Sequence, residues 1–421
     1  MHAPRLRRAR PTLLFLGASV SQLPSIRHAR ERGYRVVAVD GDPNAVAFPY
    51  ADVAECVDFA ELERVAEAGA RHRVDGVLAI SSDRAVVPAA AVAAELGLPG
   101  IGVEVATAMT DKSTMRARLA AEDVAQPRYR ILTANGDLTA AFRDVGAPAV
   151  LKPVDSGGQR GVFRIESVDD VTRHLDEALA LSRTGRAILE QFVPGIELNG
   201  IFVVRGGVPR LITLSDRLRP PGVGFGVGWI HSFPSSLGEA ALATAEAVAA
   251  AAIRALGLRD GIAFPQLIVS EDGSARVIEV AARIAAGQMA DLVRFATGID
   301  LFDVAFAQAL GQEVPDSLVE ARSTRPVVIR FLTAGPGVLP VGRVTHVGSL
   351  DPVLGSPGVL GAGLYFGAGH TIDAVQVDAD RKGYVIATAD TAPAALDLAE
   401  QAAAKLEIRV EATGREVTAA T

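Results

Sequence analysis

Residues 264–283 read FPQLIVSEDGSARVIEVAAR, and this stretch predicts two antiparallel strands joined by a tight turn. At its centre, Asp272-Gly273 is a strong signal for a two-residue hairpin loop. Centring the register on this loop pairs Glu271 with Ser274, and every later pair follows from that one. Residues that face each other across the two arms lie on the same face of the sheet.

The same register places Gln266 directly opposite Glu279. Opposed residues have Cβ atoms roughly 4.5–5.5 Å apart, so an amide oxygen and a carboxylate would converge between apolar neighbours. Both are hard ligands that suit Mg²⁺, which also bridges phosphates. A simple hydrogen bond between Gln266 and Glu279 across the sheet also explains the pair, and the two interpretations stay open.

An apolar strand, PAVLKP at residues 148–153, carries Lys152 near its end, where a buried ammonium needs an anionic partner. The strand leads into Ser156-Gly157-Gly158, and glycines let backbone N–H groups approach a ligand closely. The alternative is a flexible turn beside a lysine whose ammonium reaches solvent. A phosphate site and this alternative both remain open.

Upstream of these stretches, the first hundred residues alternate strand and helix patterns. Apolar runs at residues 12–17, 35–40 and 76–81 predict strands, and residues 21–33 and 59–73 repeat apolar side chains at helical spacing. This alternation is typical of βαβ units in a doubly wound parallel sheet. The carboxyl ends of its strands would line one edge, where ligands usually bind.

The pattern changes at about residue 105. Residues 217–236 are rich in Gly and Pro and predict a long loop. Long loops without secondary structure more often carry functional residues than serve only as connections. We expect further helices at 107–123, 169–182, 237–256 and 391–405, and strands at 148–153, 161–166, 187–192 and 198–207. The predicted domains are a Rossmann-like domain at 1–104, a central domain at 105–320 and a C-terminal lobe at 321–421 with a tail that frays after Val410.

Composition narrows the classes of function. With 49% apolar and 22% charged residues over 421 positions, the chain has the balance of a globular protein with a large core. The net charge of −7 argues against nucleic acid or an anionic membrane as the main partner. Cys56 is the only cysteine, so an intramolecular disulfide and a thiolate zinc cluster are both impossible, which fits a reducing cytoplasm.

The N-terminus and two nucleotide signatures give negative results. The apolar run after the basic N-terminus is too short for a spanning helix and is better explained as the first strand. Residues 111–114, DKST, lack the upstream glycines of a P-loop. The first strand is followed by GASVSQ and not by the G-x-G-x-x-G signature of a dinucleotide site. A bound nucleotide must therefore be held in another way.

Four blocks, in this order, resemble the ATP-grasp superfamily: DKSTMRARL, PAVLKPVDSGGQRGV, AILEQFVPGIELNG and VIEVAARIAAGQ. The resemblance extends over about residues 12–410, and VVIRFLTAGPG is similar to the C-terminal lobe of the L-amino-acid ligase (dipeptide synthetase) branch. It implies an α/β fold of ATP-grasp architecture, with a parallel Rossmann-like N-terminal lobe, central ATP-grasp lobes and a small C-terminal lobe. It also implies ATP and Mg²⁺ as cofactors, with Mn²⁺ as an alternative metal.

The resemblance also assigns the nucleotide-binding residues. Lys112 and Lys152 would hold the phosphates of ATP, and the Ser156-Gly157-Gly158 loop would close over them.

The resemblance assigns the binding of adenine and ribose to the third block. Glu190 and the backbone from Gln191 to Val193 would form the adenine hinge, and Glu197 would take the ribose hydroxyls. Taken alone, each of these two glutamates is more simply interpreted as a solvated carboxylate.

The resemblance assigns metal binding and catalysis to residues of the β-hairpin, the last block and the predicted loop. Gln266 and Glu279 would bind Mg²⁺, and Arg283 would steady the acyl phosphate and the tetrahedral oxygen. His231 would either contact substrate or be a structural histidine. Ala281 stands where the family's E-x-N-P-R run usually has Asn, which leaves the number of metal ions open.

The implied function is that of a carboxylate–amine ligase that works through an acyl phosphate, with amino acids as the favoured substrates. Its partners would be a small-molecule carboxylate and amine, with no nucleic acid and no membrane, and a homodimer stays an open option. One rival is an ATP-grasp enzyme that activates bicarbonate or formate, as biotin carboxylases and purine-pathway ligases do. A second is a regulatory protein that binds ATP without catalysis.

Overall fold

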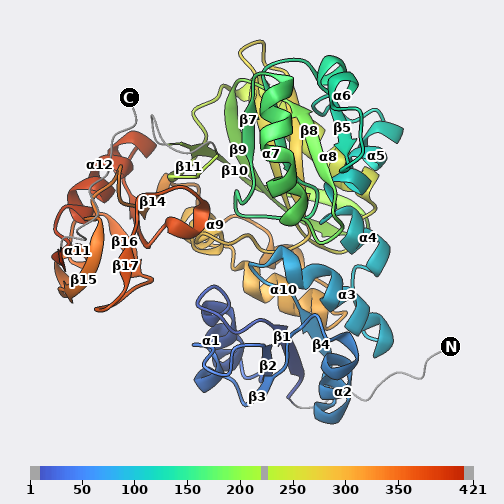
Figure 1. Ribbon diagram of the computed structural model, residues 1–421. Coiled ribbons are helices and arrows are strands. Elements are labelled where there is room, and N and C mark those ends of the chain that lie inside the picture. The colour runs from blue at the N-terminus through green and yellow to red at the C-terminus, as the bar shows by residue number, and fades with distance from the viewer. Residues whose placement is uncertain (1–9, 220–225, 412–421) are drawn as a thin grey trace.

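The structure of the protein, a computed structural model, describes residues 10–219 and 226–411. Two predictions fall partly outside this part of the chain: the tail after Val410 from residue 412 on, and positions 220–225 of the predicted loop. Figure 1 shows the N-terminal strands in blue below the green and yellow strands, with the C-terminal strands in orange and red to one side. The mixed α/β class expected from the sequence is confirmed.

The N-terminal strands form a parallel sheet in the order β3-β2-β1-β4. Alternate residues of β1 pack into two different cores, so both faces of the sheet are buried and the strands are apolar throughout. The third predicted strand ends at Leu78 rather than at residue 81, because the N–H of Ser81 donates to the carbonyl of Ile284. The elements are β1 (Thr12–Leu16), α1 (Leu23–Glu31), β2 (Arg35–Asp40), β3 (Val53–Cys56), α2 (Leu62–His72), β4 (Gly76–Leu78) and α3 (Val86–Glu95).

A second sheet, with the order β5-β8-β6-β7, is antiparallel and is covered by α6 and α7. The single helix predicted at 107–123 is wrong, because two helices flank Asp111. The Asp111 side chain accepts from the N–H of Thr114 and so begins a new helix, α5. The elements are α4 (Val103–Ala108), α5 (Lys112–Ala121), β5 (Tyr129–Leu132), α6 (Leu138–Val145), β6 (Ala149–Pro153), β7 (Phe163–Ile165), α7 (Val168–Ala180) and β8 (Ala187–Gln191).

The largest sheet has eight strands in the order β13-β12-β9-β10-β11-β14-β18-β16. The predicted loop at 217–236 is partly wrong, since β10 runs on to Leu218 and a further strand, β11, spans Ile230–Phe233. Helix α8 packs on β10, β12 and β13, and neither it nor any other described helix is long and apolar enough to cross a membrane. The elements are β9 (Ile196–Arg205), β10 (Val208–Leu218), α8 (Glu239–Leu256), β12 (Gly261–Val269), β13 (Ala275–Ala281), β14 (Val327–Leu332), β16 (Val359–Leu364) and β18 (Gly383–Thr388).

The C-terminal strands continue this sheet, since β11 pairs with β14 and β14 with β18. The hydrogen bonding thus crosses the predicted domain limit at residue 320, and the division into three domains stays a prediction. Helix α10 returns to the parallel sheet and packs on β4 and α1, as Figure 1 shows. The remaining elements are α9 (Met289–Thr297), α10 (Leu301–Ala309), β15 (Gly342–Val347), α11 (Asp351–Leu354), β17 (Thr371–Ile372), α12 (Ala392–Ala403) and β19 (Ile408–Glu411).

Candidate active site

Lys152 lies near the end of β6 with its ammonium almost completely buried. Its side chain is 9% exposed, and Nζ lies 2.7 Å from Oε2 of Glu190 on the neighbouring strand β8. Glu190 also accepts a hydrogen bond from Nε of Arg116 at 2.7 Å. Burial would raise the pKa of Glu190, but the charges of Arg116 and Lys152 together outweigh it and lower the pKa to about 2. The interpretation of Glu190 as a solvated carboxylate is therefore wrong; it is the anion that Lys152 requires.

Lys112, at the start of α5, connects the glycine turn to the hairpin. Its Nζ donates to the carbonyl of Ser156 at 3.0 Å and lies 3.3 Å from Oε1 of Glu279. The turn packs closely on the parallel sheet, because a Cβ added to Gly157 would lie only 3.2 Å from Oδ2 of Asp83. A larger residue at this position would therefore crowd the Asp83 carboxylate.

The β12–β13 hairpin pairs Gln266 with Glu279, as predicted, but through a different turn. The N–H of Ser270 donates to the carbonyl of Ser274 at 2.9 Å, which leaves a loop of three residues, 271–273. The predicted pairing of Glu271 with Ser274 is therefore wrong. From this turn onward the ladder is offset by one residue from the predicted register.

A β-bulge in β13 removes this offset. The register shifts between Gln266 and Leu267, so that Ile278 has no partner of its own on β12. Arg116 satisfies the bulged backbone: Nη1 donates to the carbonyl of Val277 at 3.0 Å and Nη2 to that of Ile278 at 2.7 Å. A buried arginine thus holds the bulge that restores Gln266 opposite Glu279.

A third oxygen-bearing side chain, Asn199, joins this pair. It lies on β9 directly opposite Gln266, is completely buried, and its Oδ1 accepts from Nε2 of Gln266 at 3.2 Å. Gln266 is hydrogen-bonded to Asn199, and Glu279 accepts a hydrogen bond from Lys112. Within the described residues, Gln266 and Glu279 therefore do not form the simple hydrogen bond to each other. One carboxylate and two amide oxygens therefore come from three adjacent strands.

Arg283, two residues beyond β13, forms a bidentate ion pair with Asp83. Nε lies 2.8 Å from Oδ1 and Nη2 lies 2.7 Å from Oδ2. Burial would raise the pKa of Asp83, but Arg283 opposes it and the pKa is lowered. Asp83 follows β4 of the parallel sheet and was not among the predicted site residues, although it holds the arginine predicted to act in catalysis.

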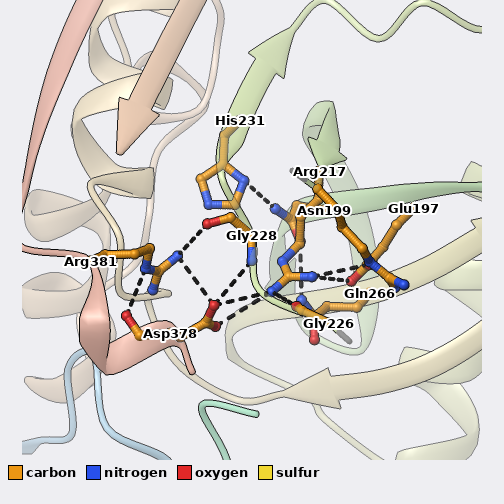
Figure 2. A network of polar contacts seen from close by, with 10 residues as sticks. Glu197, Asn199, Arg217, Gly226, Gly228, His231, Gln266, Asp378 and Arg381 are labelled. Atoms are coloured by element: carbon orange, nitrogen blue, oxygen red, sulfur yellow. Dashed lines mark hydrogen bonds and ion pairs between the residues drawn. The ribbon is translucent and has the colours of Figure 1, made fainter. Parts of the chain in front are cut away.

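Figure 2 shows a buried polar network around Arg217. Nη1 of Arg217 donates to both carboxylate oxygens of Glu197, at 3.0 and 3.1 Å, and Nη2 lies 3.4 Å from Asp378. Glu197 also accepts from Nη2 of Arg219 at 2.5 Å. The interpretation of Glu197 as a solvated carboxylate is therefore wrong as well. Because Asp378 precedes β18, the network connects the C-terminal strands to the centre of the sheet.

His231 lies on β11 rather than in a loop, and it is buried. Its Nδ1 lies 2.8 Å from Nδ2 of Asn199, and since an amide nitrogen only donates, Nδ1 accepts and the proton is on Nε2. Burial first, and then the charges of Arg381 and Arg217, lower the pKa of His231 well below its usual value. The imidazole is therefore neutral at physiological pH and carries its N–H on Nε2.

One cavity of about 290 Å³, here called the site cavity, is lined by all thirteen predicted site residues. These are Lys112, Lys152, Ser156, Gly157, Gly158, Glu190, Gln191, Val193, Glu197, His231, Gln266, Glu279 and Arg283. It also contains charged and polar residues that were not predicted, namely Asp83, Asn199, Arg217, Arg219, Asp378 and Arg381. A larger cavity of about 680 Å³ shares only Arg283 with it and is lined mainly by small apolar side chains. The roles of the thirteen residues stay predictions.

Comparison with known proteins identifies two long segments of the chain. Residues 111–317 match the family described as carbamoyl-phosphate synthase L chain, ATP binding domain. Residues 330–411 match the family described as L-amino acid ligase C-terminal domain 2. The chain belongs to the ATP-grasp superfamily.

Individual relatives of this ATP-grasp protein are distant. An uncharacterised protein of Sinorhizobium fredii is 28% identical over 74% of this chain and 63% of its own length. The carbamoyl phosphate synthase large chain of Methanoculleus marisnigri is 25% identical over 71% of this chain and 29% of its own, so the chain spans less than two thirds of either relative. The L-amino acid ligase of Bacillus licheniformis has the same fold, with a TM-score of 0.82, 20% identity, and coverage of 96% of this chain and 100% of that one.

Of the site residues that the ATP-grasp resemblance left out, Arg217 carries a sequence signal and the others do not. Arg217 stands inside the apolar β10, where it is almost completely buried, and charged residues in such positions rarely lack a partner. Asn199 lies within one of the four ATP-grasp blocks, but its importance depends on pairing with β12, which the sequence does not specify. Asp83 and Arg381 flank strands of two other regions, and their neighbours are set by tertiary contacts alone.

Proposed function

We propose that the protein is an ATP-dependent carboxylate–amine ligase that acts on amino acids. It activates a carboxylate as an acyl phosphate and passes the acyl group to an amine, releasing ADP and phosphate. The proposal is supported above all by the site cavity, in which two buried lysines, a glycine turn, three oxygen ligands and Arg283 face one another. The match of residues 330–411 to an L-amino acid ligase domain supports amino acids as the substrates.

The donor atoms in the cavity suit a hard divalent cation. Glu279 would hold Mg²⁺ with the amide oxygens of Gln266 and Asn199, and these ligand types are the ones that Mg²⁺ prefers. Asn199 offers an amide oxygen that Ala281 does not. When bound, Mg²⁺ supplies positive charge beside the phosphates of ATP.

Two lysines and the glycine turn would bind and cover the triphosphate. The ion pair with Glu190 keeps the ammonium of Lys152 in one position, so little reorganisation is needed when phosphates arrive. Lys112 ties the turn at Ser156 to the hairpin, and a closed turn excludes the water that would hydrolyse an acyl phosphate.

The other side chains would bind the nucleoside and stabilise the transition states. The backbone of Gln191 and Val193 would receive adenine, and Glu197 the ribose hydroxyls. Arg283, oriented by Asp83, would compensate the charge that develops on the transferred phosphoryl group and then on the tetrahedral oxygen. His231 is neutral, so it would donate a hydrogen bond to a substrate oxygen.

A product search tests this proposal. The protein is incubated with ATP, Mg²⁺ and pooled amino acids; ADP release is measured, and products are identified by mass spectrometry, with Arg283→Ala as the control for contaminating activity. We expect amino-acid-dependent ADP release and new products with dipeptide masses. ADP release stimulated by bicarbonate or formate instead would support the enzymatic rival. Tight ATP binding without turnover of any carboxylate would support a regulatory nucleotide-binding protein.

A further inference from the structure

An adjoining cavity of about 380 Å³ lies beside the site cavity and is large enough for a small ligand. It is lined by the start of α9 and by Phe331 and Tyr365, among others. The two cavities share one wall, which consists of Ser81, Ala285, Ala286, Asp378 and Arg381. The lysines proposed to bind phosphate line the site cavity only, so Arg381 is the cation at the junction of the two cavities.

The guanidinium of Arg381 is held rigidly at this junction, with its side chain 14% exposed. Nε donates to the carbonyl of Asp378 at 2.9 Å, Nη1 donates to that of Gly228 at 3.4 Å, and the group lies 4.2 Å over the ring of Phe331. Within the described residues, no acceptor is within hydrogen-bonding distance of Nη2. A fixed guanidinium with an unused donor is suited to a carboxylate.

Arg381 has no carboxylate to itself within the described residues. Glu197 is paired with Arg217 and Arg219, and the carboxylate of Asp378 lies between Arg217, at 3.4 Å, and Arg381, at 3.7 Å. Arg381 therefore shares its one carboxylate partner with Arg217, which lies closer to it. Burial lowers the pKa of Arg381, and Asp378 offsets this only in part.

The neighbouring acid and imidazole do not give Arg381 a second anion. Asp291 of the adjoining cavity is already paired with Arg294 at 3.0 Å, and Lys382 is a further cation in the lining of that cavity. His231 is neutral, and its Nε2 points toward Gly287, where an added Cβ would lie 3.7 Å away. Figure 2 shows this uncharged donor near Arg381, and an anion between them would be stabilised by both.

We propose that Arg381, assisted by the Nε2–H of His231, binds the unreacted carboxylate of the amine substrate, which is therefore an amino acid. This inference rests on the proposed ligase function and adds the group that selects its second substrate. The carboxylate that becomes activated must lie beside the phosphate-binding lysines of the site cavity. A carboxylate that remains ionised needs a separate cation, and Arg381 supplies it where the adjoining cavity begins.

The test compares amino acids with their primary amides, which keep the amine but lack the second carboxylate. Wild type, Arg381→Ala, Arg381→Lys and the exposed control Arg343→Ala are assayed for ADP release with the protein amino acids and these amides as acceptors. For Arg381→Ala we expect KM for the amino-acid acceptor to rise by at least about tenfold, the effect of losing one charge-assisted contact, with KM for the amide unchanged. Arg381→Lys should recover part of the loss, and Arg343→Ala should behave as wild type.

Binding measurements separate this inference from the ligase proposal. Calorimetry with the same amino acids and amides, in the presence of a non-hydrolysable ATP analogue, gives a readout that needs no turnover. Amino-acid binding lost only in Arg381→Ala, with the affinity for the analogue unchanged, supports the inference even if the reaction differs. An equal loss for amino acid and amide, or weaker binding of the ATP analogue in a folded variant, would overturn it. If Arg381→Ala fails to fold, Arg381→Lys takes its place in the comparison. A ratio of amino-acid affinity to amide affinity that is the same in Arg381→Lys as in wild type would then overturn the inference.

Discussion

Glu190 forms ion pairs with two buried cations, and their charges keep its carboxylate ionised. Arg116 and Lys152 lie on either side of its carboxylate, and its pKa is lowered to about 2. Because the pKa in the folded protein lies below that of an ordinary glutamate, ionised Glu190 stabilises the fold at neutral pH. That stabilisation is lost as the pH falls from about 4.5 toward 2. Lys152 therefore has a fixed anionic partner throughout the physiological range.

Glu279→Gln is the substitution that best tests the metal assignment. The amide keeps the shape of the side chain but removes the only anionic member of the proposed ligand set, so Mg²⁺ should bind more weakly. We expect the rate of phosphate release to fall at least about a hundredfold, since lost transition-state electrostatics typically cost 10²–10³ in rate. The rate is measured across a Mg²⁺ titration.

The matched control for this substitution is Glu271→Gln, which changes an exposed glutamate in the loop of the same hairpin. It should turn over as wild type does, and both variants should keep the melting temperature of wild type. Normal turnover by a folded Glu279→Gln protein would remove the support for a metal at this position.

At the scale of the element, the β12–β13 hairpin shows how a local turn and a distant side chain cooperate. Gly273 has φ of 79°, which lets the chain close a three-residue loop and sets the ladder one residue out of the predicted register. The bulge at Ile278 then restores the pairing of Gln266 with Glu279, and Arg116 binds the carbonyls of Val277 and Ile278. The turn therefore affects stability, whereas the bulge determines the geometry of the site.

Gly273→Ala should accordingly destabilise the protein without changing its activity. No atom lies within 4 Å of a Cβ added there, so the cost is the backbone strain of a left-handed residue, about 1–2 kcal/mol. Urea denaturation should show this decrease, and turnover per folded molecule should stay unchanged. Gly273→Asn is the comparison, because asparagine tolerates this conformation better and should lose less stability. A variant with unchanged stability but reduced turnover would contradict this division of roles.

At the scale of the whole molecule, the site cavity is assembled from regions far apart in the sequence. Asp83 comes from the parallel sheet, Arg283 from the hairpin 200 positions later, and Asp378 from the segment before β18. The eight-stranded sheet connects the last two, and α10 packs against the first. Figure 1 shows the three regions around this centre, so a change in how they pack would alter the cavity directly.

Asp83→Asn should weaken this assembly. An amide cannot match both N–H groups of Arg283 with charged oxygens, and hydrogen bonds to charged groups contribute about 1.5–3 kcal/mol each. We expect a lower free energy of unfolding, and turnover that falls more than ATP affinity does, because Arg283 loses its orientation. Glu95→Gln, an exposed change in the same region, should affect neither quantity. Stability and turnover equal to those of wild type would show that the pair does not position Arg283.

Local patterns in the sequence predict most of the helices and strands, and they predict thirteen residues that line the site cavity. Strands 12–17 and 35–40 and the glycine turn follow from patterns within about twenty residues, whereas the opposition of Gln266 and Glu279 also requires the bulge that Arg116 holds. These features can be predicted because periodicity, turn residues and the order of the four blocks are all visible in the sequence. For this reason the predicted site residues line one cavity, although their individual roles stay predictions.

Which charged side chains form ion pairs, and which strands pair, depends on how distant parts of the chain fold together. Glu190 and Glu197 are indistinguishable from solvated glutamates until Arg116 and Arg217 are folded against them. Strand β11 has four residues beside a glycine-rich stretch, and it forms because β10 and β14 flank it. The physical reason is the same in each case: an ion pair or a ladder depends on atoms within a few ångströms, and for these residues the partners are brought there by chain topology from distant parts of the sequence.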